Sequence, residues 1–213
     1  MIAGGGKVSA ASRGIGRNGA GPPVRVLGIG GSTRLGSTSL AALRSALRLA
    51  AEAGAETALA DVRTLALPLY DEDRAVADYP ASLGHLLAAA RAADAYLLCT
   101  PTYLGTIAGA LKNVLDLLSF LASEAPPYLG GKPVGLMAVG GANAAQALVA
   151  LQQTAQSLNG LVVPTVVTVP RWAIGAGSEG LVDAAIRRRL QRMTGELVDV
   201  GGRLRRPIMA GVD

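Results

Sequence analysis

From Val24 onward, five short runs of aliphatic and β-branched residues alternate with longer segments rich in alanine and leucine. This alternation is typical of successive β-strand and α-helix units that build a parallel sheet. Each apolar run is nearly continuous, which indicates strands that are covered by helices on both faces. The predicted strands are Val24 to Ile29, Ala55 to Ala60, Ala95 to Thr100, Pro133 to Val139 and Val162 to Val169. The predicted helices are Thr38 to Ala53, Ala81 to Ala93, Ile107 to Ser123, Ala144 to Leu158 and Glu179 to Val200.

The length of 213 residues suits one domain of this kind, and the two ends differ in composition from the middle. Residues 1–23 are rich in glycine, contain no acidic residue and hold no apolar run, so they lack the burial that would offset the entropy of ordering. We therefore expect a disordered leader over 1–23, one α/β domain over 24–202 and a basic tail over 203–213 that contains Arg203, Arg205 and Arg206.

No stretch of the chain is predicted to cross a membrane. Arg91 and Asp94 interrupt the apolar residues 83–100, and Asn143 ends the run that begins at Val134. The leader has no signal-peptide core, so we expect a cytoplasmic protein, although an acid-free, basic leader could also address an organelle.

The composition also limits the chemistry. With one cysteine, Cys99, and one histidine, His85, the chain can form neither an internal disulfide nor a zinc or iron–sulfur cluster, so we expect no metal site. The formal net charge of +5 suits anionic ligands. Aromatic residues make up only 3% of the chain, too few for the stacking platforms of single-strand binders, so we expect no nucleic-acid partner.

In an open parallel sheet, ligands bind outside the carboxyl ends of the strands, where helix N-termini converge. The loop after the first predicted strand, residues 30–39, carries hydroxyl groups, free backbone N–H groups and the Arg34 guanidinium just before a helix, which suits a phosphate. Two known phosphate-binding loops do not fit this segment. Ser37 stands where the loop of a nucleotide triphosphatase needs lysine, which disfavours that class of enzyme. Thr33 occupies the third glycine position of a dinucleotide fingerprint, which disfavours classical NAD binding. The alternative interpretation is a helix N-cap at Ser37 with a solvated Arg34 and no ligand.

Two further loops lie at the same predicted edge. The loop over residues 100–109 combines a proline turn, the aromatic ring of Tyr103 and exposed backbone donors, which could hold the edge of a flat heterocycle. It could equally be an ordinary turn that shields the core. After the fourth strand, Gly140 and Gly141 leave the backbone open to a flat ligand. Together the three loops predict one pocket in a sheet ordered 2-1-3-4-5.

At this point the sequence resembles the NADPH-dependent FMN reductase family of the flavodoxin-like superfamily, over residues from about Val24 to Arg171. The resemblance implies a flavodoxin-like three-layer α/β sandwich around a five-stranded parallel sheet in the order 2-1-3-4-5. It rests on five motifs, which are GSTRLGS at 31–37, LPLYDED at 67–73, PTY at 101–103, LKN at 111–113 and GG at 140–141.

The resemblance also implies which residues bind FMN. Those expected at the phosphate are Ser32, Arg34, Ser37, Thr38 and Ser39. Those expected along the isoalloxazine and ribityl groups are Pro101, Thr102, Tyr103, Leu104, Gly105 and Thr106, with Gly140 and Gly141 at the other edge of the ring. Leu104 and Ser39 depart from the family, which often has asparagine there. Leu104 lacks the side-chain hydrogen bonding of asparagine, so the resemblance implies only a main-chain contact with FMN at this position.

The activity that the resemblance implies is transfer of hydride from NADPH to bound FMN and then of electrons to a small acceptor. The acceptors in the family include free flavin, quinones, azo compounds, metal oxyanions and a partner monooxygenase. A homodimer or homotetramer is also implied. The aliphatic residues 114–121 could supply its interface, or they could be buried inside the monomer.

Two other functions remain open from the sequence, namely a flavodoxin-type electron carrier and a flavin-free interaction protein of the same fold. We assign no catalytic acid, base or nucleophile, because His85 is expected on a helix surface and Cys99 in a buried strand. Two charged groups also stay outside the predicted site and are interpreted as solvated surface, although the first could shape the mouth of the pocket and the second could reach the adenosine phosphate of NADPH. They are the acidic turn Asp71, Glu72 and Asp73 and the basic helix residues Arg187, Arg188, Arg189 and Arg192.

Overall fold

The computed structural model describes residues 22–175 and 180–205. Nearly all of the predicted leader and most of the predicted tail lie outside these residues. Within the described ranges, no helix is both long enough and apolar enough to cross a membrane. The same ranges hold no group of three or more histidine, cysteine or acidic side chains that could bind a metal ion.

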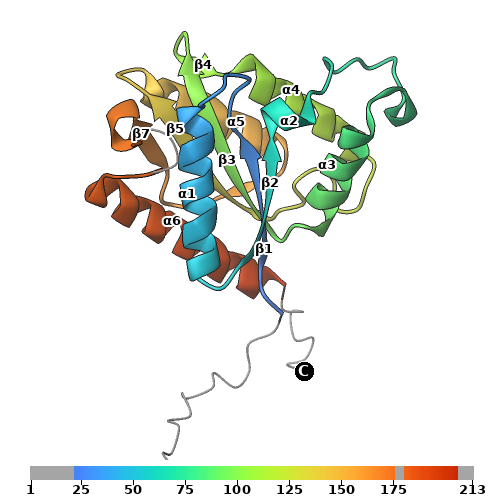
Figure 1. Ribbon diagram of the computed structural model, residues 1–213. Helices are drawn as coiled ribbons and strands as arrows, with labels where there is room; N and C mark the ends of the chain where they lie inside the picture. The colour runs from blue at the N-terminus through green and yellow to red at the C-terminus, as the bar shows by residue number, and fades with distance from the viewer. Residues whose placement is uncertain (1–21, 176–179, 206–213) are drawn as a thin grey trace, which may run out of the picture.

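A central sheet runs through the molecule in the order β2-β1-β3-β5, and two short strands, β6 and β7, pair with the free side of β5 (Figure 1). All of these strands are parallel, which confirms the predicted order of five successive strand positions. A short strand, β4, pairs antiparallel with the end of β3. The bounds are β1 Arg25–Gly30, β2 Glu56–Asp61, β3 Ala95–Tyr103, β4 Thr106–Ile107, β5 Pro133–Gly140, β6 Leu161–Val162 and β7 Val167–Pro170.

Helices cover both faces of the sheet (Figure 1). One apolar core lies beneath α1 and α6, and a second lies beneath α3, α4 and α5. This arrangement explains the unbroken apolar runs, because each central strand is buried on both sides. The helices are α1 Thr38–Glu52, α2 Val62–Leu65, α3 Ala81–Ala92, α4 Gly109–Leu117, α5 Ala144–Ser157 and α6 Ala184–Leu204, with 3-10 turns η1 Val76–Asp78, η2 Leu118–Leu121 and η3 Arg171–Ala173.

The predicted fifth strand, Val162 to Val169, is wrong as one continuous element. It is divided into β6 and β7 by residues 163–166. Pro164 lies in this interruption and has no N–H group to donate to a strand ladder. The next N–H group, that of Thr165, donates to Glu196 Oε2 on α6 at 2.9 Å. Helix α6 therefore takes a hydrogen bond that a continuous strand would give to β5.

Two predicted helices also begin at the wrong residue. Ile107 was expected to start a helix, but it pairs with Thr102 in the β3–β4 hairpin, so α4 begins at Gly109. The predicted start of the last helix, Glu179, lies outside the described residues, and residues 180–183 are not helical. The helix begins at Ala184, where the Asp183 side chain caps it by accepting from the Ile186 N–H at 2.8 Å. It continues past the predicted end at Val200 to Leu204.

The aliphatic residues 114–121 belong to the monomer core. These residues belong to α4 and η2, and their large aliphatic side chains, at most 2% exposed, pack in the core that α3 and α5 share. Burial within one chain therefore accounts for this stretch without a subunit interface.

Candidate functional site

Gly30 and Gly31 carry the chain from β1 across the end of β3. A Cβ atom at Gly30 would lie 2.2 Å from the Cys99 carbonyl oxygen, which no side chain can do without displacing the backbone. Gly31 has a φ of 95°, a conformation that favours glycine. Its N–H group donates to the same carbonyl at 3.4 Å. The loop that follows is thus held against the central strand of the sheet.

The hydroxyl groups of this loop are fixed around the start of α1. Ser37 is the N-cap, and its Oγ accepts from the Leu40 N–H at 3.1 Å and lies 2.9 Å from Ser39 Oγ. Ser32 Oγ accepts from the Arg34 N–H at 3.3 Å. The N–H groups of Thr38 and Ser39 have no acceptor in the described part of the chain, as expected for the first turn of a helix. These groups, together with the positive end of the helix dipole, make the start of α1 suited to an anion.

The segment after the third strand is a hairpin rather than a simple turn. Tyr103 pairs with Thr106, and the two residues between them, Leu104 and Gly105, have φ values of 50° and 77°. Two successive residues with positive φ form the tight turn that suits a two-residue hairpin. At its base, the buried Thr100 hydroxyl donates to the Pro101 carbonyl at 2.8 Å and accepts from the Ala108 N–H at 3.0 Å.

Gly140, at the end of β5, packs directly against this hairpin. A Cβ atom there would lie 2.6 Å from Thr102 Oγ1. That hydroxyl oxygen is buried and has no hydrogen-bond partner among the described residues. Buried hydroxyl groups are nearly always paired, so the Thr102 hydroxyl is available to a group outside the described residues.

These loops line one cavity of about 90 Å³ that opens to solvent. Its lining residues lie at or just beyond the carboxyl ends of β1, β3, β5 and β7. These strand ends are at the top of the view in Figure 1. It is lined by Ser32, Arg34, Ser37, Thr38, Ser39, Pro101, Thr102, Tyr103, Val139, Gly140, Gly141 and Arg171.

The structure thus brings together the predicted residues of all three loops, apart from the end of the hairpin. Leu104, Gly105 and Thr106 do not line the cavity, because they lie at the turn of the hairpin and on its returning strand. Val139 and Arg171 line it but were not predicted. Arg171 directly follows the last strand, so the rule that ligands bind at strand carboxyl ends could have identified it.

Two of the other motifs, residues 67–73 and residues 111–113, are joined to each other by hydrogen bonds. The Asn113 side chain on α4 donates to the Pro68 carbonyl at 2.9 Å and accepts from the Tyr70 N–H at 2.8 Å. It thereby ties residues 67–73 to the helix that follows the hairpin. The neighbouring acidic residues Asp71, Glu72 and Asp73 are exposed and do not line the cavity.

Neither of the two candidate side chains for acid–base or nucleophilic chemistry lines the cavity. His85 is exposed on α3. Cys99 is fully buried, and its thiol donates to the Ser39 carbonyl at 3.3 Å. Burial raises the pKa of Cys99 to about 12, so its thiol stays protonated at neutral pH. Cys99 therefore acts as a packing residue beneath the loop.

The sequence matches a family of known proteins and several of its relatives. Residues 24–173 match the model of the NADPH-dependent FMN reductase family. An NAD(P)H-dependent FMN reductase of Pseudomonas aeruginosa is 39% identical over 115 residues, which cover 54% of this chain and 58% of that protein. An NADPH azoreductase of a Bacillus species is 42% identical over 40% of this chain and 44% of its own length. A quinone reductase of Escherichia coli is 27% identical over 84% of this chain and 87% of its own length. The chain thus spans about half the length of the first curated relatives that it matches.

Solved structures show the same fold. The flavoenzyme NAD(P)H:(acceptor) oxidoreductase FerB of Paracoccus denitrificans superposes with a TM-score of 0.67 at 23% identity, over 84% of this chain and 98% of that one. An archaeal flavodoxin superposes with a TM-score of 0.56 at 9% identity, over 84% and 99%. At these identities the likeness establishes the flavodoxin-like fold and no more.

Proposed function

The chain belongs to the NADPH-dependent FMN reductase family, and on that premise we propose that it binds FMN and catalyses electron transfer from NADPH to a small acceptor. The observation that carries the proposal is the cavity itself. It combines hydroxyl groups, free N–H groups and Arg34 at the start of α1 with a glycine-lined opening at Gly140 and Gly141. No aspartate or glutamate is among its lining residues.

The residues present fit a flavin mononucleotide. Ser32, Arg34 and Ser37 would hold the phosphate with the first N–H groups of α1, since a charged donor and a helix start both favour an anion. The unpaired Thr102 hydroxyl supports a polar ligand deeper in the cavity, because it lacks a partner within the described chain. The missing side chains at Gly140 and Gly141 would let a flat ring approach the backbone.

FMN, when bound, supplies the capacity to accept hydride and to release electrons. The protein residues therefore need only bind, orient and polarise. Gly141 lines the cavity, whereas Gly105 does not, and the Gly141 N–H has no acceptor among the described residues. We assign to this N–H the stabilisation of negative charge at the ring edge. No side chain is assigned a proton-transfer role.

Relatives named as an NADPH azoreductase and a quinone reductase support a planar acceptor such as a quinone or an azo compound. Leu35 follows Arg34, Leu104 follows Tyr103, and both side chains are at least 75% exposed. Burial of such exposed apolar side chains against a second copy would be favourable in a homodimer or homotetramer.

The test is to mix the purified chain with FMN, NADPH and a quinone or azo acceptor. Oxidation of NADPH that depends on FMN and on the chain would support the reductase. Flavin binding without NADPH oxidation would instead indicate an electron carrier. Absence of both would leave a flavin-free interaction protein with this fold.

A further inference from the structure

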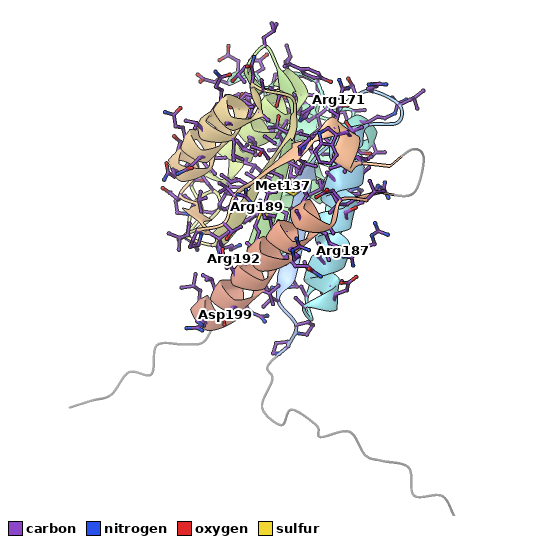
Figure 2. The ribbon with its side chains drawn as sticks, turned by 90° about the vertical axis from the view of Figure 1, so that its left-hand side faces the viewer. Met137, Arg171, Arg187, Arg189, Arg192 and Asp199 are labelled. Carbon is purple, nitrogen blue, oxygen red and sulfur yellow. The ribbon has the colours of Figure 1, made fainter. Side chains whose placement is uncertain are left out.

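A second arginine, Arg171, lines the same cavity as Arg34. It is the first residue of η3 and comes from the far end of the chain, beyond the five motifs on which the family resemblance rests. Figure 2 shows Arg171 near the carboxyl end of the sheet, apart from Arg187, Arg189 and Arg192, which lie along α6. Arg171 is thus separate from the basic surface of that helix.

The sheet fixes the backbone of Arg171. The preceding residue, Pro170, pairs with Gly140 in the register of β7 and β5, so Arg171 lies one step beyond a lining residue of the neighbouring strand. After it, Ala173 is fully buried, and the Ile174 N–H donates to the Arg171 carbonyl at 3.2 Å. The position is therefore set by strand pairing and core packing, while the Arg171 side chain remains exposed.

The guanidinium groups in the cavity differ from those on α6. On the helix, Arg187 lies 3.7 Å from Glu52, Arg189 donates to the Val166 carbonyl at 3.1 Å, and Arg192 pairs with Glu196 at 3.0 Å. Neither Arg34 nor Arg171 forms a side-chain hydrogen bond or ion pair with any described residue. Within residues 22–175 and 180–205 their donors have no partner, and no lining carboxylate offsets their two positive charges.

We propose that Arg171 is a second phosphate-binding residue, which with Arg34 makes the cavity select FMN over riboflavin. This inference rests on the proposed function. A phosphate monoester carries between about one and a half and two negative charges at neutral pH, which matches the two guanidinium groups. Arginine can form two parallel hydrogen bonds to phosphate oxygens, so a pair of arginines can hold the group from two sides.

The chain carries a reporter next to this residue. Trp172 is the single tryptophan, and its side chain is 70% exposed. Titration of FMN and of riboflavin into the apo chain, followed by Trp172 fluorescence and by calorimetry, would give both dissociation constants without any turnover. The variants are Arg171→Ala, Arg171→Lys and, as a matched control, Arg188→Ala, which removes an exposed arginine of α6 outside the cavity.

We expect Arg171→Ala to raise the dissociation constant for FMN by at least about tenfold and to leave that for riboflavin within about twofold. Arg171→Lys should recover part of the loss, and Arg188→Ala should change neither constant. Thermal unfolding of the apo variants should match that of the parent, since the Arg171 side chain is exposed.

Three results would overturn the inference. An unchanged dissociation constant for FMN in Arg171→Ala would remove Arg171 from the phosphate. An equal loss for FMN and riboflavin would place its effect on the ring or on the fold. A raised KM for NADPH with an unchanged FMN constant would assign it to the dinucleotide instead. If the parent chain binds FMN tightly, any of these three results overturns the role of Arg171 and leaves the proposed function standing. If the parent chain does not bind FMN, the role of Arg171 and the proposed function are both overturned.

Discussion

Gly30 shows how a single missing side chain shapes the site. The loop after β1 can lie against β3 only because no Cβ atom meets the Cys99 carbonyl oxygen. We expect Gly30→Ala to lower the free energy of unfolding by about 3 kcal/mol or more, because backbone of the central strand would have to move. Denaturant unfolding monitored by circular dichroism measures this.

The matched control for Gly30 is Gly84, which is exposed in α3 and has open space where a Cβ atom would be. Alanine is the better helix former, so Gly84→Ala should raise the free energy of unfolding by about 0.5–1 kcal/mol. Equal stability of the two variants would mean that the contact with the Cys99 carbonyl does not constrain the loop.

Arg34 is the charged residue of the predicted phosphate loop. Loss of its guanidinium in Arg34→Ala should weaken FMN binding by about 1.5–3 kcal/mol, the range for a charge-assisted hydrogen bond. Riboflavin, which has no phosphate, should bind the variant as it binds the parent. Calorimetric titration checks both values, and an unchanged FMN affinity would take Arg34 out of the site.

Glu196 shows how one element holds another. Its carboxylate accepts from the Thr165 N–H at 2.9 Å, from the Thr165 hydroxyl at 2.7 Å and from Arg192 Nε at 3.0 Å. Burial raises the pKa of Glu196, but the hydrogen bonds from Thr165 and Arg192 outweigh burial, so its pKa lies below the ordinary value. Helix α6 thereby fixes the chain between β6 and β7.

The lowered pKa of Glu196 predicts a pH dependence. A carboxylate whose folded-state pKa is lowered adds stability above its unfolded pKa of about 4.3, and that stability is lost as the pH falls through the folded value. Glu196→Gln should therefore be less stable than the parent by about 1–2 kcal/mol at pH 7, and the difference should shrink below about pH 4. Unfolding measured across this range tests the prediction, with the exposed Glu72→Gln as control. A constant difference at all pH values would contradict it.

The elements differ in how far the sequence could predict them. The strands β1, β3 and β5 are unbroken apolar runs, so their pattern alone indicated burial on both faces. Pro164 is a local signal for the break in the fifth strand, whereas the contact of Glu196 with Thr165, 31 residues away in the chain, is one that no local pattern contains. The start of α4 was misplaced for a similar reason, because Ile107 forms a strand pair with Thr102 instead of joining the helix.

For the site, the strand-end rule and the family motifs together predicted most of the lining residues. Leu104 does not line the cavity, because it lies in the two-residue turn of the hairpin. Arg171 was missed because it follows the last strand and belongs to none of the motifs. A search of every strand end for unpaired charge would have found it.

At the scale of the whole molecule, the two ends of the described chain meet at the edge opposite the cavity (Figure 1). Asp94, whose side chain is 8% exposed, accepts from the Arg25 N–H at 2.8 Å and pairs with Arg205 at 3.3 Å. These contacts join the first strand, the turn before β3 and the end of α6. The two ends of the described chain are thus joined at the amino ends of the strands, whereas the cavity lies at their carboxyl ends.

The most direct test of the central claim is anaerobic mixing of the FMN-loaded chain with NADPH while the visible absorbance of the flavin is recorded. If the cavity is the flavin site of an NADPH-dependent reductase, an equimolar amount of NADPH should bleach the oxidised flavin, and added quinone should restore its absorbance. The account would be contradicted if the chain retained no FMN, or if bound FMN stayed oxidised with NADPH in excess.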